Sequence, residues 1–436
     1  MKFNTINRIA KAAALSLAVG FGTTACTYDY TADYLYAVSN STGQISAYTV
    51  DYQSGVLTQI NGSPFPTNLT NPVTVVAAPN GKTIYVIGGS QNANVEVMSI
   101  GSDGKLYGLA TPSLYGNATY PTAAAIDSTG THLYVTYTYQ GGFSPVSPGP
   151  GGIAIYPINA DGTLGTPTNT NVGNNPVAIA TSVPTCTATP ALSASVTGLS
   201  SPNCIIIGSG ATANNGYTNT FLYVAEATIL NPTTSPVATG GTILGFVENP
   251  KDGSLVSIPG PTNGGFSAGV WPSSLIVDLT GKYVYMTDKQ QNEIFGYQIS
   301  NATTGALTGL VSSPYATGQY PVSITIEPRD KYVYVANYNS ATVSSYSLNL
   351  ANGSLGASAG SNFSTTTAPT CVNVEPELGI YLYTSDYLNA SVSGGQLSPN
   401  TGQLSAVANS FFPSVSQPIC LVTVPNGAHA LQEVQP

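Results

Sequence analysis

Charged side chains are scarce in this chain of 436 residues, since Asp, Glu, Lys and Arg together make up only 7% of it. Helical proteins use many such residues, so their scarcity argues against a mostly helical fold. Tyr, Thr, Ser, Asn and Gly are abundant instead, with 28 tyrosines and 46 glycines. Aromatic and β-branched residues favour strands, whereas Asn, Ser and Gly favour turns. The composition therefore predicts many strands joined by polar turns.

Basic residues are scarcer still, with 10 Lys and Arg against 19 Asp and Glu. Three of the ten, Lys2, Arg8 and Lys11, lie within the first 25 residues, which contain no acidic side chain. After that segment the chain has 7 basic and 19 acidic residues, a net charge of −12. Proteins bind phosphate backbones through clustered Lys and Arg, so we expect no nucleic-acid partner.

Familiar catalytic motifs are missing as well. The sequence has no His-Glu-x-x-His, no Cys-x-x-Cys and no phosphate-binding loop, and we predict no metal-ligating residue from it. Its two histidines are His132, in a turn before a strand, and His429, near the end of the chain. We predict that both are surface residues rather than general bases. Arg329, the single arginine after residue 25, is expected in a turn.

The N-terminal segment has the pattern of a targeting signal. Its three basic residues precede an apolar run over residues 12–21 that is too short to span a bilayer. Ala25 then precedes Cys26, as in the bacterial lipobox, although Thr23 stands where that pattern prefers Leu. We predict a lipoprotein signal peptide over 1–25, lipidation of Cys26 and a short tether over 26–32. This places the protein outside the cytoplasm, anchored at the outer membrane or surface of a bacterium; ordinary signal cleavage is the alternative.

Seven copies of one pattern follow: an aliphatic-Tyr strand, an aliphatic-x-x-Tyr strand and a Gly-x-Leu turn. The tyrosines of the first element are Tyr36, Tyr85, Tyr134, Tyr223, Tyr285, Tyr334 and Tyr383. The glycines of the third are Gly55, Gly104, Gly162, Gly253, Gly305, Gly353 and Gly402. A period of about 40–50 residues built from strands is typical of propeller blades, because one small sheet buries its faces only when neighbours stack on it. We predict an all-β, seven-bladed β-propeller over residues 33–428, with 429–436 as a tail.

A proline opens the inner strand of each blade, at Pro72, Pro121, Pro176, Pro272, Pro321, Pro369 and Pro418. The long interval between Pro176 and Pro272 contains one copy of the pattern, so we predict a single blade with an insertion over 186–217 on the face opposite the mouth defined below. The chain begins within a blade, and residues 418–425 supply a spare inner strand. We predict that this strand pairs with the N-terminal strand and closes the ring, which removes free sheet edges.

Four cysteines follow Cys26, and outside the cytoplasm disulfides are the expected state. Three pairings are open. Cys186 and Cys204 lie in the same insertion, while Cys371 and Cys420 lie at equivalent positions of two repeats, each two residues after its proline. We favour Cys186–Cys204 and Cys371–Cys420, the second of which would join the ring where its ends meet.

Two sets of residues should surround one mouth of the central channel, because loops before inner strands and loops after second strands share a face of a propeller. The pre-proline set is Asn71, Tyr120, Asn175, Trp271, Tyr320, Ala368 and Gln417. The post-strand set is Ser39, Gly88, Tyr137, Glu226, Asp288, Asn337 and Asp386.

From these sets we predict a ligand site, with aromatic faces for stacking and polar groups as hydrogen-bond partners or ligands of a divalent cation. Its members are Tyr120, Tyr137, Glu226, Trp271, Asp288, Tyr320, Asn337 and Asp386. The alternative is that the Asn and Asp side chains cap turns and that the aromatic rings pack against the next blade.

Two further groups of residues can be assigned to faces. Residues 140–152 and 227–242 are predicted loops that overhang the mouth. A second acidic series ends the inner strands on the opposite face and is predicted to form turns: Asp127, Asp278, Glu327 and Glu375.

The repeat over Pro321–Asn337, with its proline, aliphatic strand, turn and Tyr-Val-Ala-Asn, resembles the YVTN-type repeats of the seven-bladed lactonase family. The resemblance covers residues 33–428, and the family includes 6-phosphogluconolactonases and carboxy-muconate cyclases. It implies a site of His, Glu and Arg residues in the channel mouth. Glu226 resembles the family's glutamate after a Tyr-Val strand, but residues 173–176, which match its histidine-bearing stretch, contain no histidine, and no arginine is expected at the mouth.

The leading hypothesis is therefore a non-catalytic binding or scaffold module that uses the channel mouth. Its partner would be a small molecule, a carbohydrate or an envelope protein; we expect a monomer that meets the membrane through its lipid alone. No cofactor is expected, with a divalent cation at the mouth as the alternative. The second hypothesis is a lactone hydrolase of the 6-phosphogluconolactonase type with Glu226 as general base.

Overall fold

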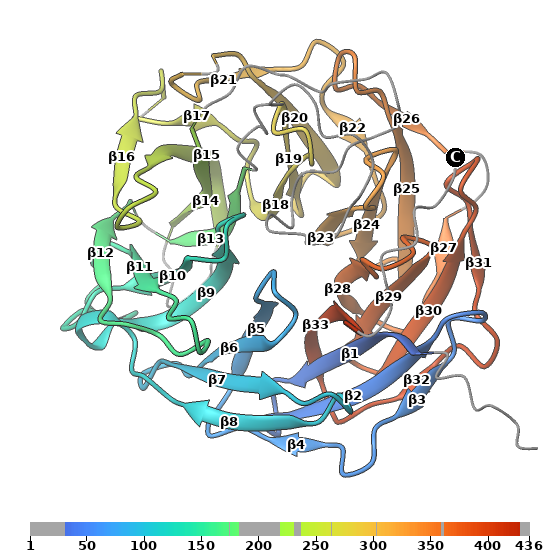
Figure 1. Ribbon diagram of the computed structural model, residues 1–436. Helices are drawn as coiled ribbons and strands as arrows, with labels where there is room; N and C mark the ends of the chain where they lie inside the picture. The colour runs from blue at the N-terminus through green and yellow to red at the C-terminus, as the bar shows by residue number, and fades with distance from the viewer. Residues whose placement is uncertain are drawn as a thin grey trace, which may run out of the picture.

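The computed structural model describes residues 31–173, 175–182, 219–230, 237–262, 264–301, 303–358 and 362–427. These residues form seven antiparallel sheets that follow one another around a ring (Figure 1). The all-β, seven-bladed fold is confirmed. The predicted signal peptide, the lipidation site Cys26, the pair Cys186 and Cys204, and the C-terminal tail lie outside the described residues.

The sheets are numbered here as blades 1 to 7, each given from its inner strand outward. Blade 1 contains β33 (Pro418–Pro425), β1 (Thr31–Ser39), β2 (Gln44–Asp51), β3 (Leu57–Gln59) and β4 (Phe65–Pro66). Blade 2 contains β5 (Pro72–Ala77), β6 (Thr83–Gly88), β7 (Asn94–Ile100) and β8 (Leu106–Ala110). Blade 3 contains β9 (Thr119–Ile126), β10 (His132–Tyr139), β11 (Gly152–Pro157) and β12 (Thr168–Asn171). A short 3-10 turn, η1 (Tyr115–Asn117), precedes β9.

Blade 4 contains β13 (Pro176–Thr181), β14 (Phe221–Leu230), β15 (Val237–Glu248), β16 (Leu255–Ile258) and β17 (Phe266–Ser267). Blade 5 contains β18 (Pro272–Val277), β19 (Tyr283–Asp288), β20 (Glu293–Ile299), β21 (Leu307–Gly309) and β22 (Tyr315–Ala316). Blade 6 contains β23 (Pro321–Ile326), β24 (Tyr332–Asn337), β25 (Thr342–Leu348), β26 (Leu355–Ala357) and β27 (Phe363–Ser364). Blade 7 contains β28 (Pro369–Val374), β29 (Tyr381–Asp386), β30 (Ser391–Leu397), β31 (Leu404–Ala406) and β32 (Phe412–Pro413).

The two ends of the described chain share blade 1, as the spare inner strand predicted. β1 pairs antiparallel with β33, from Asp33 opposite Pro425 to Val38 opposite Cys420, and Figure 1 shows the blue and red strands side by side. The Cys371–Cys420 disulfide joins β28 to β33, the inner strands of neighbouring blades. This predicted pairing is confirmed. The ring is thus closed by a sheet and by a covalent bond at the same place.

The repeated Tyr and Gly residues form one contact that recurs between all seven pairs of neighbouring blades. Each repeat tyrosine donates its hydroxyl proton to the carbonyl of the repeat glycine in the next blade, at distances of 2.6–3.3 Å. The last of these runs from Tyr383 of blade 7 to Gly55 of blade 1. All seven glycines have φ between 66° and 85°, a backbone conformation that glycine adopts without strain. The sequence repeat is therefore the record of an interface between blades.

The hydrophobic core consists of layers between blades rather than of one central cluster. Seven clusters of buried side chains occur among the described residues, and each combines residues of two neighbouring blades. The cluster between blades 7 and 1, for example, joins Tyr383 and Val392 to Leu35 and Tyr48. Because every blade buries both faces in this way, no blade could keep its core without both neighbours.

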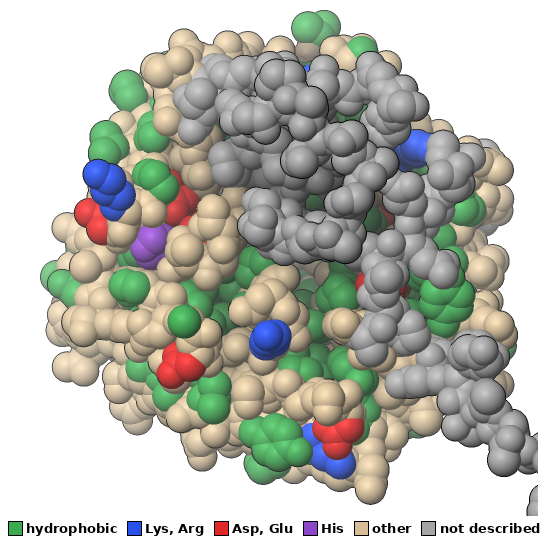
Figure 2. All heavy atoms as spheres, in the orientation of Figure 1, with side chains coloured by type: hydrophobic (Ala, Val, Ile, Leu, Met, Phe, Trp, Pro, Cys, Tyr) green, Lys and Arg blue, Asp and Glu red, His purple; other side chains and the backbone are tan. Residues whose placement is uncertain are grey.

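Two sequence predictions at the surface need correction. Residues 227–242 were expected to form a loop, but β14 continues to Leu230 and β15 begins at Val237, so strand pairing extends through most of that range. His132 was expected at the surface, but it is the first residue of β10 and is 4% exposed. Figure 2 shows that charged side chains on the visible face are few and scattered. In the described residues no helix is long and apolar enough to cross a membrane.

The second acidic series forms turns, as predicted. Asp278 accepts hydrogen bonds from the backbone of Lys282 (2.7 Å) and Tyr283 (2.6 Å) with one carboxylate oxygen. Asp127, Glu327 and Glu375 accept backbone N–H groups of their own turns in the same manner. Arg329 lies in one of these turns, where its Nε is 2.8 Å from a Glu327 oxygen. The opposite face of the ring is thus an arrangement of carboxylate-capped turns.

The wild-type protein should lose stability as the pH rises from acidic to mildly alkaline, and replacing Asp330 with asparagine should reduce that loss. Burial and the charge of Asp278 in the neighbouring blade raise the pKa of Asp330 to about 8, well above the usual range of an aspartate. A carboxyl whose folded pKa is raised stabilises the fold fully below its unfolded pKa, and that contribution disappears as the pH rises through the folded pKa. The wild type should therefore lose melting temperature between pH 4 and about pH 8. Asp330→Asn, which mimics the protonated acid, should lose less.

The measurement is the thermal midpoint of both proteins at pH 5 and pH 8.5. The exposed Asp161→Asn is the matched control, because hydrogen bonds from Thr163 lower the pKa of Asp161 and its titration lies below this range. Equal pH slopes in wild type and Asp330→Asn would refute the assignment.

Candidate functional site

The pre-proline and post-strand sets meet at one end of every blade. Each post-strand residue is paired across the sheet with the proline of its own blade, as Asp288 is with Pro272 and Asn337 with Pro321. The other five pairs are Ser39–Pro418, Gly88–Pro72, Tyr137–Pro121, Glu226–Pro176 and Asp386–Pro369. A β-bulge lies beside the paired proline in each blade. Both sets therefore lie at the predicted mouth.

An unusual backbone conformation shapes this end. Six of the seven pre-proline residues have φ between 50° and 61°: Asn71, Tyr120, Asn175, Tyr320, Ala368 and Gln417. Such values are uncommon outside glycine and often occur at functional sites. The carbonyl of the pre-proline residue accepts a hydrogen bond from the residue that follows the post-strand position, as Trp271 does from Lys289 (3.1 Å) and Tyr320 from Tyr338 (2.9 Å). The residue after each post-strand position is thereby held beside the mouth.

The polar post-strand side chains are buried behind the surface of the mouth, in what we call its wall. Asp288, Asn337 and Asp386 are 0% exposed. The carboxylate of Asp288 accepts backbone hydrogen bonds from Val270, Trp271, Gln290 and Gln291. Asn337 and Asp386 are bound to hydroxyl groups of their own blades. These side chains fix the loops around the mouth, as in the turn-capping alternative stated above.

Two of the predicted aromatic residues lie in blade 3, away from the others. Tyr137 is buried, and its hydroxyl donates to the Asn169 side chain at 2.5 Å. Tyr120 is half-buried and packs edge-on against Tyr139, with ring centroids 5.7 Å apart. The predicted loop over 140–152 follows β10 at this end, and Gln140 donates a backbone hydrogen bond to Pro150 within it. These residues build the blade 3 side of the rim.

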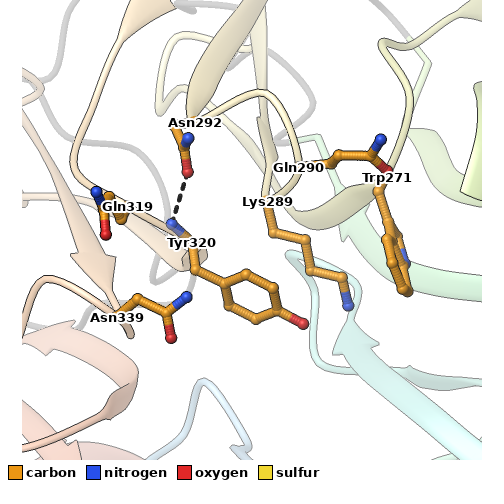
Figure 3. Close-up of a pocket in the computed structure, with 7 residues that line it drawn as sticks. All are labelled: Trp271, Lys289, Gln290, Asn292, Gln319, Tyr320 and Asn339. Carbon is orange, nitrogen blue, oxygen red and sulfur yellow. Dashed lines mark hydrogen bonds between the residues drawn. The ribbon is translucent and has the colours of Figure 1, made fainter. Parts of the chain in front are cut away.

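A cavity of about 490 Å³ opens at the mouth between blades 5 and 6. Trp271 and Tyr320, both predicted site residues, stand on either side of it (Figure 3). The other lining residues are Lys289, Gln290, Asn292, Gln319 and Asn339. We call these seven residues the mouth pocket. All come from loops before inner strands or after second strands, so the sequence had located the pocket's rim but only two of its side chains.

Lys289 is the pocket residue that the sequence interpretation missed. Its Nζ lies 4.4 Å from the Trp271 ring centroid and 5.5 Å from that of Tyr320, within the range of a cation–π contact. Figure 3 shows its side chain between the two rings. Burial lowers the pKa of Lys289. No local signal identified it, because the direction of Lys289 depends on the loop that the Asp288 carboxylate binds.

Four amide side chains complete the mouth pocket. Asn292 uses its carbonyl oxygen to accept the backbone N–H of Tyr320 (2.8 Å), which positions that ring. The side chains of Gln290, Gln319 and Asn339 belong to exposed residues. Amides both donate and accept hydrogen bonds, so they suit a ligand with several hydroxyl groups. The pocket thus combines two flat aromatic faces, one cation and several amides.

Glu226 occupies the rim in blade 4, and its carboxyl group is in an unusual state. Oε1 is buried without a hydrogen-bond partner. Burial raises the pKa of Glu226 to about 7, although a hydrogen bond from the backbone of Gly173 opposes the shift. A Cβ atom on Gly173 would lie 2.5 Å from Oε2, so a larger residue there would displace the Glu226 carboxyl group. A carboxyl group with such a pKa can take or give a proton near neutral pH.

A closed ring of seven antiparallel blades, each of four or five strands, defines a seven-bladed β-propeller. The model of the lactonase family, described as "Lactonase, 7-bladed beta-propeller", matches residues 43–180 and 251–374. This match covers more than half of the chain, and the protein belongs to that family. No curated protein sequence matches the chain.

Solved structures of similar fold include three bacterial proteins. A proposed 6-phosphogluconolactonase from Bacteroides uniformis shares 15% identity, with a TM-score of 0.64 over 90% of this chain and 100% of that one. A proposed 6-phosphogluconolactonase from Bacteroides fragilis shares 17% identity, with a TM-score of 0.62 over 91% and 99%. The periplasmic gluconolactonase PpgL of Pseudomonas aeruginosa shares 16% identity, with a TM-score of 0.61 over 92% and 99%. At these identities the likeness concerns the fold alone.

Proposed function

We propose that this protein binds a carbohydrate or a related ring compound with several hydroxyl groups in the mouth pocket, and that it acts as a binding module. The observation that carries the proposal is the pairing of Trp271 and Tyr320 across a cavity lined by amides. The apolar face of a sugar ring stacks on an aromatic ring, while its hydroxyl groups exchange hydrogen bonds with amide side chains. A cavity of about 490 Å³ has room for one or two sugar rings.

Lys289 narrows the class of ligand. Burial lowers the pKa of Lys289, and a negatively charged oxygen atom beside its Nζ would favour the charged form and pair with it. A carboxylate of a sugar acid or the carbonyl of a sugar lactone provides such an oxygen. We therefore expect sugar acids and their lactones to bind more tightly than neutral sugars of the same size.

Binding without turnover agrees with the state of the nearby acidic groups. The carboxylate oxygens of Asp288 and Asp386 accept hydrogen bonds from the protein. We therefore assign these residues to positioning the loops of the mouth rather than to activating water or binding a divalent cation. Arg329 lies in a turn at the opposite end of the ring. The wider proposal is a lipoprotein anchored through Cys26 outside the cytoplasm, monomeric, with a small molecule, carbohydrate or envelope protein as its partner.

Lactone hydrolysis is the second candidate, because Glu226 combines an unpaired buried oxygen with a pKa of about 7. As a carboxylate it would take a proton from water while the water oxygen adds to the lactone carbonyl. The ring C–O bond would then break, and the ring oxygen would recover that proton to become a hydroxyl group.

Trp271→Ala should weaken ligand binding at least tenfold, since a buried aromatic anchor of this kind contributes about 2 kcal/mol or more. The measurement is titration calorimetry with a ligand chosen by thermal shift from neutral sugars, uronic acids, aldonic acids and their lactones. Lys289→Met should weaken acids and lactones more than neutral sugars. Tyr107→Ala, at an exposed position of the outer strand β8, is the control and should bind as the wild type does.

The same panel distinguishes the two candidates. If lactones are hydrolysed by the wild type and not by Glu226→Gln with unchanged affinity, the protein is an enzyme and the binding-module proposal is wrong. If no compound shifts the melting temperature, or if Trp271→Ala binds as tightly as the wild type, the mouth pocket is not a carbohydrate site.

A further inference from the structure

Three ionisable side chains are buried together between blades 3 and 4, at the end opposite the mouth. Asp127 directly follows the inner strand β9, His132 begins β10, and Glu248 ends β15 of the next blade. Their exposed fractions are 2%, 4% and 4%. One atom of each, His132 Nδ1 and one oxygen of each carboxylate, lies within 4.8 Å of the other two. Buried ionisable groups are rare unless they are paired or bind an ion.

The distances within this cluster do not fit hydrogen bonds. His132 Nδ1 is 3.6 Å from Asp127 Oδ2 and 3.6 Å from Glu248 Oε1. A charge-assisted hydrogen bond would bring one of these pairs to about 2.7–2.9 Å. Atoms that share a tetrahedral ion with bonds of about 2.1 Å are instead separated by roughly 3.4 Å. The two separations of 3.6 Å between nitrogen and oxygen are close to this value, and the two carboxylate oxygens lie within 4.8 Å of each other.

A second observation points the same way. Glu248 Oε2 is buried and has no hydrogen-bond partner, although the whole side chain is 2% exposed. Leaving a buried carboxylate oxygen unsatisfied is costly. The Tyr134 hydroxyl lies close enough to the Glu248 carboxylate to lower its pKa, against the larger effect of burial, and it donates to the Gly253 carbonyl at 3.3 Å. A cation bound by the Glu248 carboxylate would satisfy the charge that the protein leaves unpaired.

Asp127 and His132 are already oriented by neighbouring groups. Asp127 Oδ1 accepts the backbone N–H groups of Thr131 (2.7 Å) and His132 (3.1 Å). Its Oδ2 accepts the hydroxyl groups of Thr129 (2.7 Å) and Thr131 (2.6 Å). The Thr131 hydroxyl also lies 3.1 Å from His132 Nδ1, a contact that an ion on that nitrogen would replace. The remaining contacts orient the Asp127 carboxylate. Such outer contacts hold ligands in place before a metal binds.

We propose that Asp127, His132 and Glu248 bind one Zn²⁺ ion, which joins blade 3 to blade 4. Imidazole nitrogen and carboxylate oxygen are both zinc ligands, and three protein ligands leave a fourth position for water. Asp127 and His132 come from one blade and Glu248 from the other, so the ion spans the same interface as the hydrogen bond from Tyr134 to Gly253. The competing arrangement is a protonated imidazole held between two carboxylates, with no metal. This site is independent of the mouth pocket and of the function proposed for it.

The test begins with the full chain, produced without a histidine tag and stripped by a chelator. Zinc chloride alone should then bind at one ion per chain by calorimetry and by elemental analysis. At a hundredfold excess of free zinc over its dissociation constant, the melting temperature should rise by about 3 °C for a chain of this size. Glu248→Gln should abolish both effects, whereas Asp252→Asn, an exposed carboxylate four residues away, should change neither.

A measurement on protein with intact ligands covers the case in which Glu248→Gln fails to fold. X-ray absorption at the zinc edge should show one imidazole nitrogen among oxygen ligands, and His429→Gln should leave that spectrum unchanged, which assigns the nitrogen to His132. Absence of stoichiometric zinc binding to the stripped wild type would establish the protonated-imidazole arrangement and overturn the proposal. Zinc binding that persists in a folded Glu248→Gln protein would overturn it as well.

Discussion

Replacing both Cys371 and Cys420 with alanine should lower the free energy of unfolding by about 4 kcal/mol, the largest effect expected for any pair of side chains here. The disulfide links residues 49 positions apart, and a crosslink of that span removes much of the conformational freedom of the unfolded chain. The bond lies where β33 completes blade 1, so its removal should weaken the closure of the ring. Once β33 separates, β1 becomes an edge strand and the core between blades 7 and 1 is exposed.

Urea unfolding of the double variant and of the wild type, with and without reductant, measures this effect. Reduced wild type should unfold at nearly the same urea concentration as the double variant, which serves as its internal control. An unfolding midpoint of the double variant equal to that of the oxidised wild type would show that the strand pairing of β33 closes the ring unaided.

Gly353→Ala should destabilise the protein by roughly 2–5 kcal/mol, because two separate penalties add at this position. Its φ of 72° costs a residue with a Cβ about 1–2 kcal/mol. The added Cβ would also lie 2.4 Å from a ring carbon of Tyr283 in the neighbouring blade, and such overpacking costs about 1–3 kcal/mol. The Gly353 carbonyl accepts the Tyr285 hydroxyl at 2.7 Å, so a shift of the backbone would also weaken that bond.

Two other glycines separate these penalties. Gly264 has φ of 82° and nothing within 4 Å of an added Cβ, so Gly264→Ala should show the backbone term alone. Gly309 lies in β21 with open space around it and is not among the positive-φ residues, so Gly309→Ala should be neutral or slightly stabilising. In urea unfolding, the free energy of unfolding should be lowest for Gly353→Ala, higher for Gly264→Ala and highest for Gly309→Ala. The contact between blades would be less rigid than argued if Gly353→Ala and Gly264→Ala were equal.

The fold could be predicted because its determinants repeat. Each Tyr and each Gly of the pattern performs the same task in its blade, so a single sequence contains seven copies of the same evidence. The spare strand over residues 418–425 and the equivalent positions of Cys371 and Cys420 then led to the ring closure and to the disulfide. These inferences need only the order of strands along the chain and the pairing rules of antiparallel sheets.

The candidate site was predicted in position but only partly in composition. The proline register placed the rim correctly, and Trp271 and Tyr320 do line the pocket. Asp288 was predicted to face the ligand and Lys289 was not predicted at all, yet the end of β19 turns Asp288 into the wall and Lys289 toward the mouth. That choice depends on the bulge and on the loop that Asp288 binds, which involve residues up to 18 positions away.

By itself, the sequence determined the number of blades, the closure of the ring, the bond between its ends and the end of the propeller where a ligand site would lie. These features follow from repetition and from local strand geometry. Only the tertiary structure decided which side chains face the mouth pocket, and that His132 is buried beside Glu248 rather than exposed. Both features depend on contacts between neighbouring blades, which bring together residues about 30 to 120 positions apart. These contacts set the burial of the side chains, and no local sequence pattern encodes them.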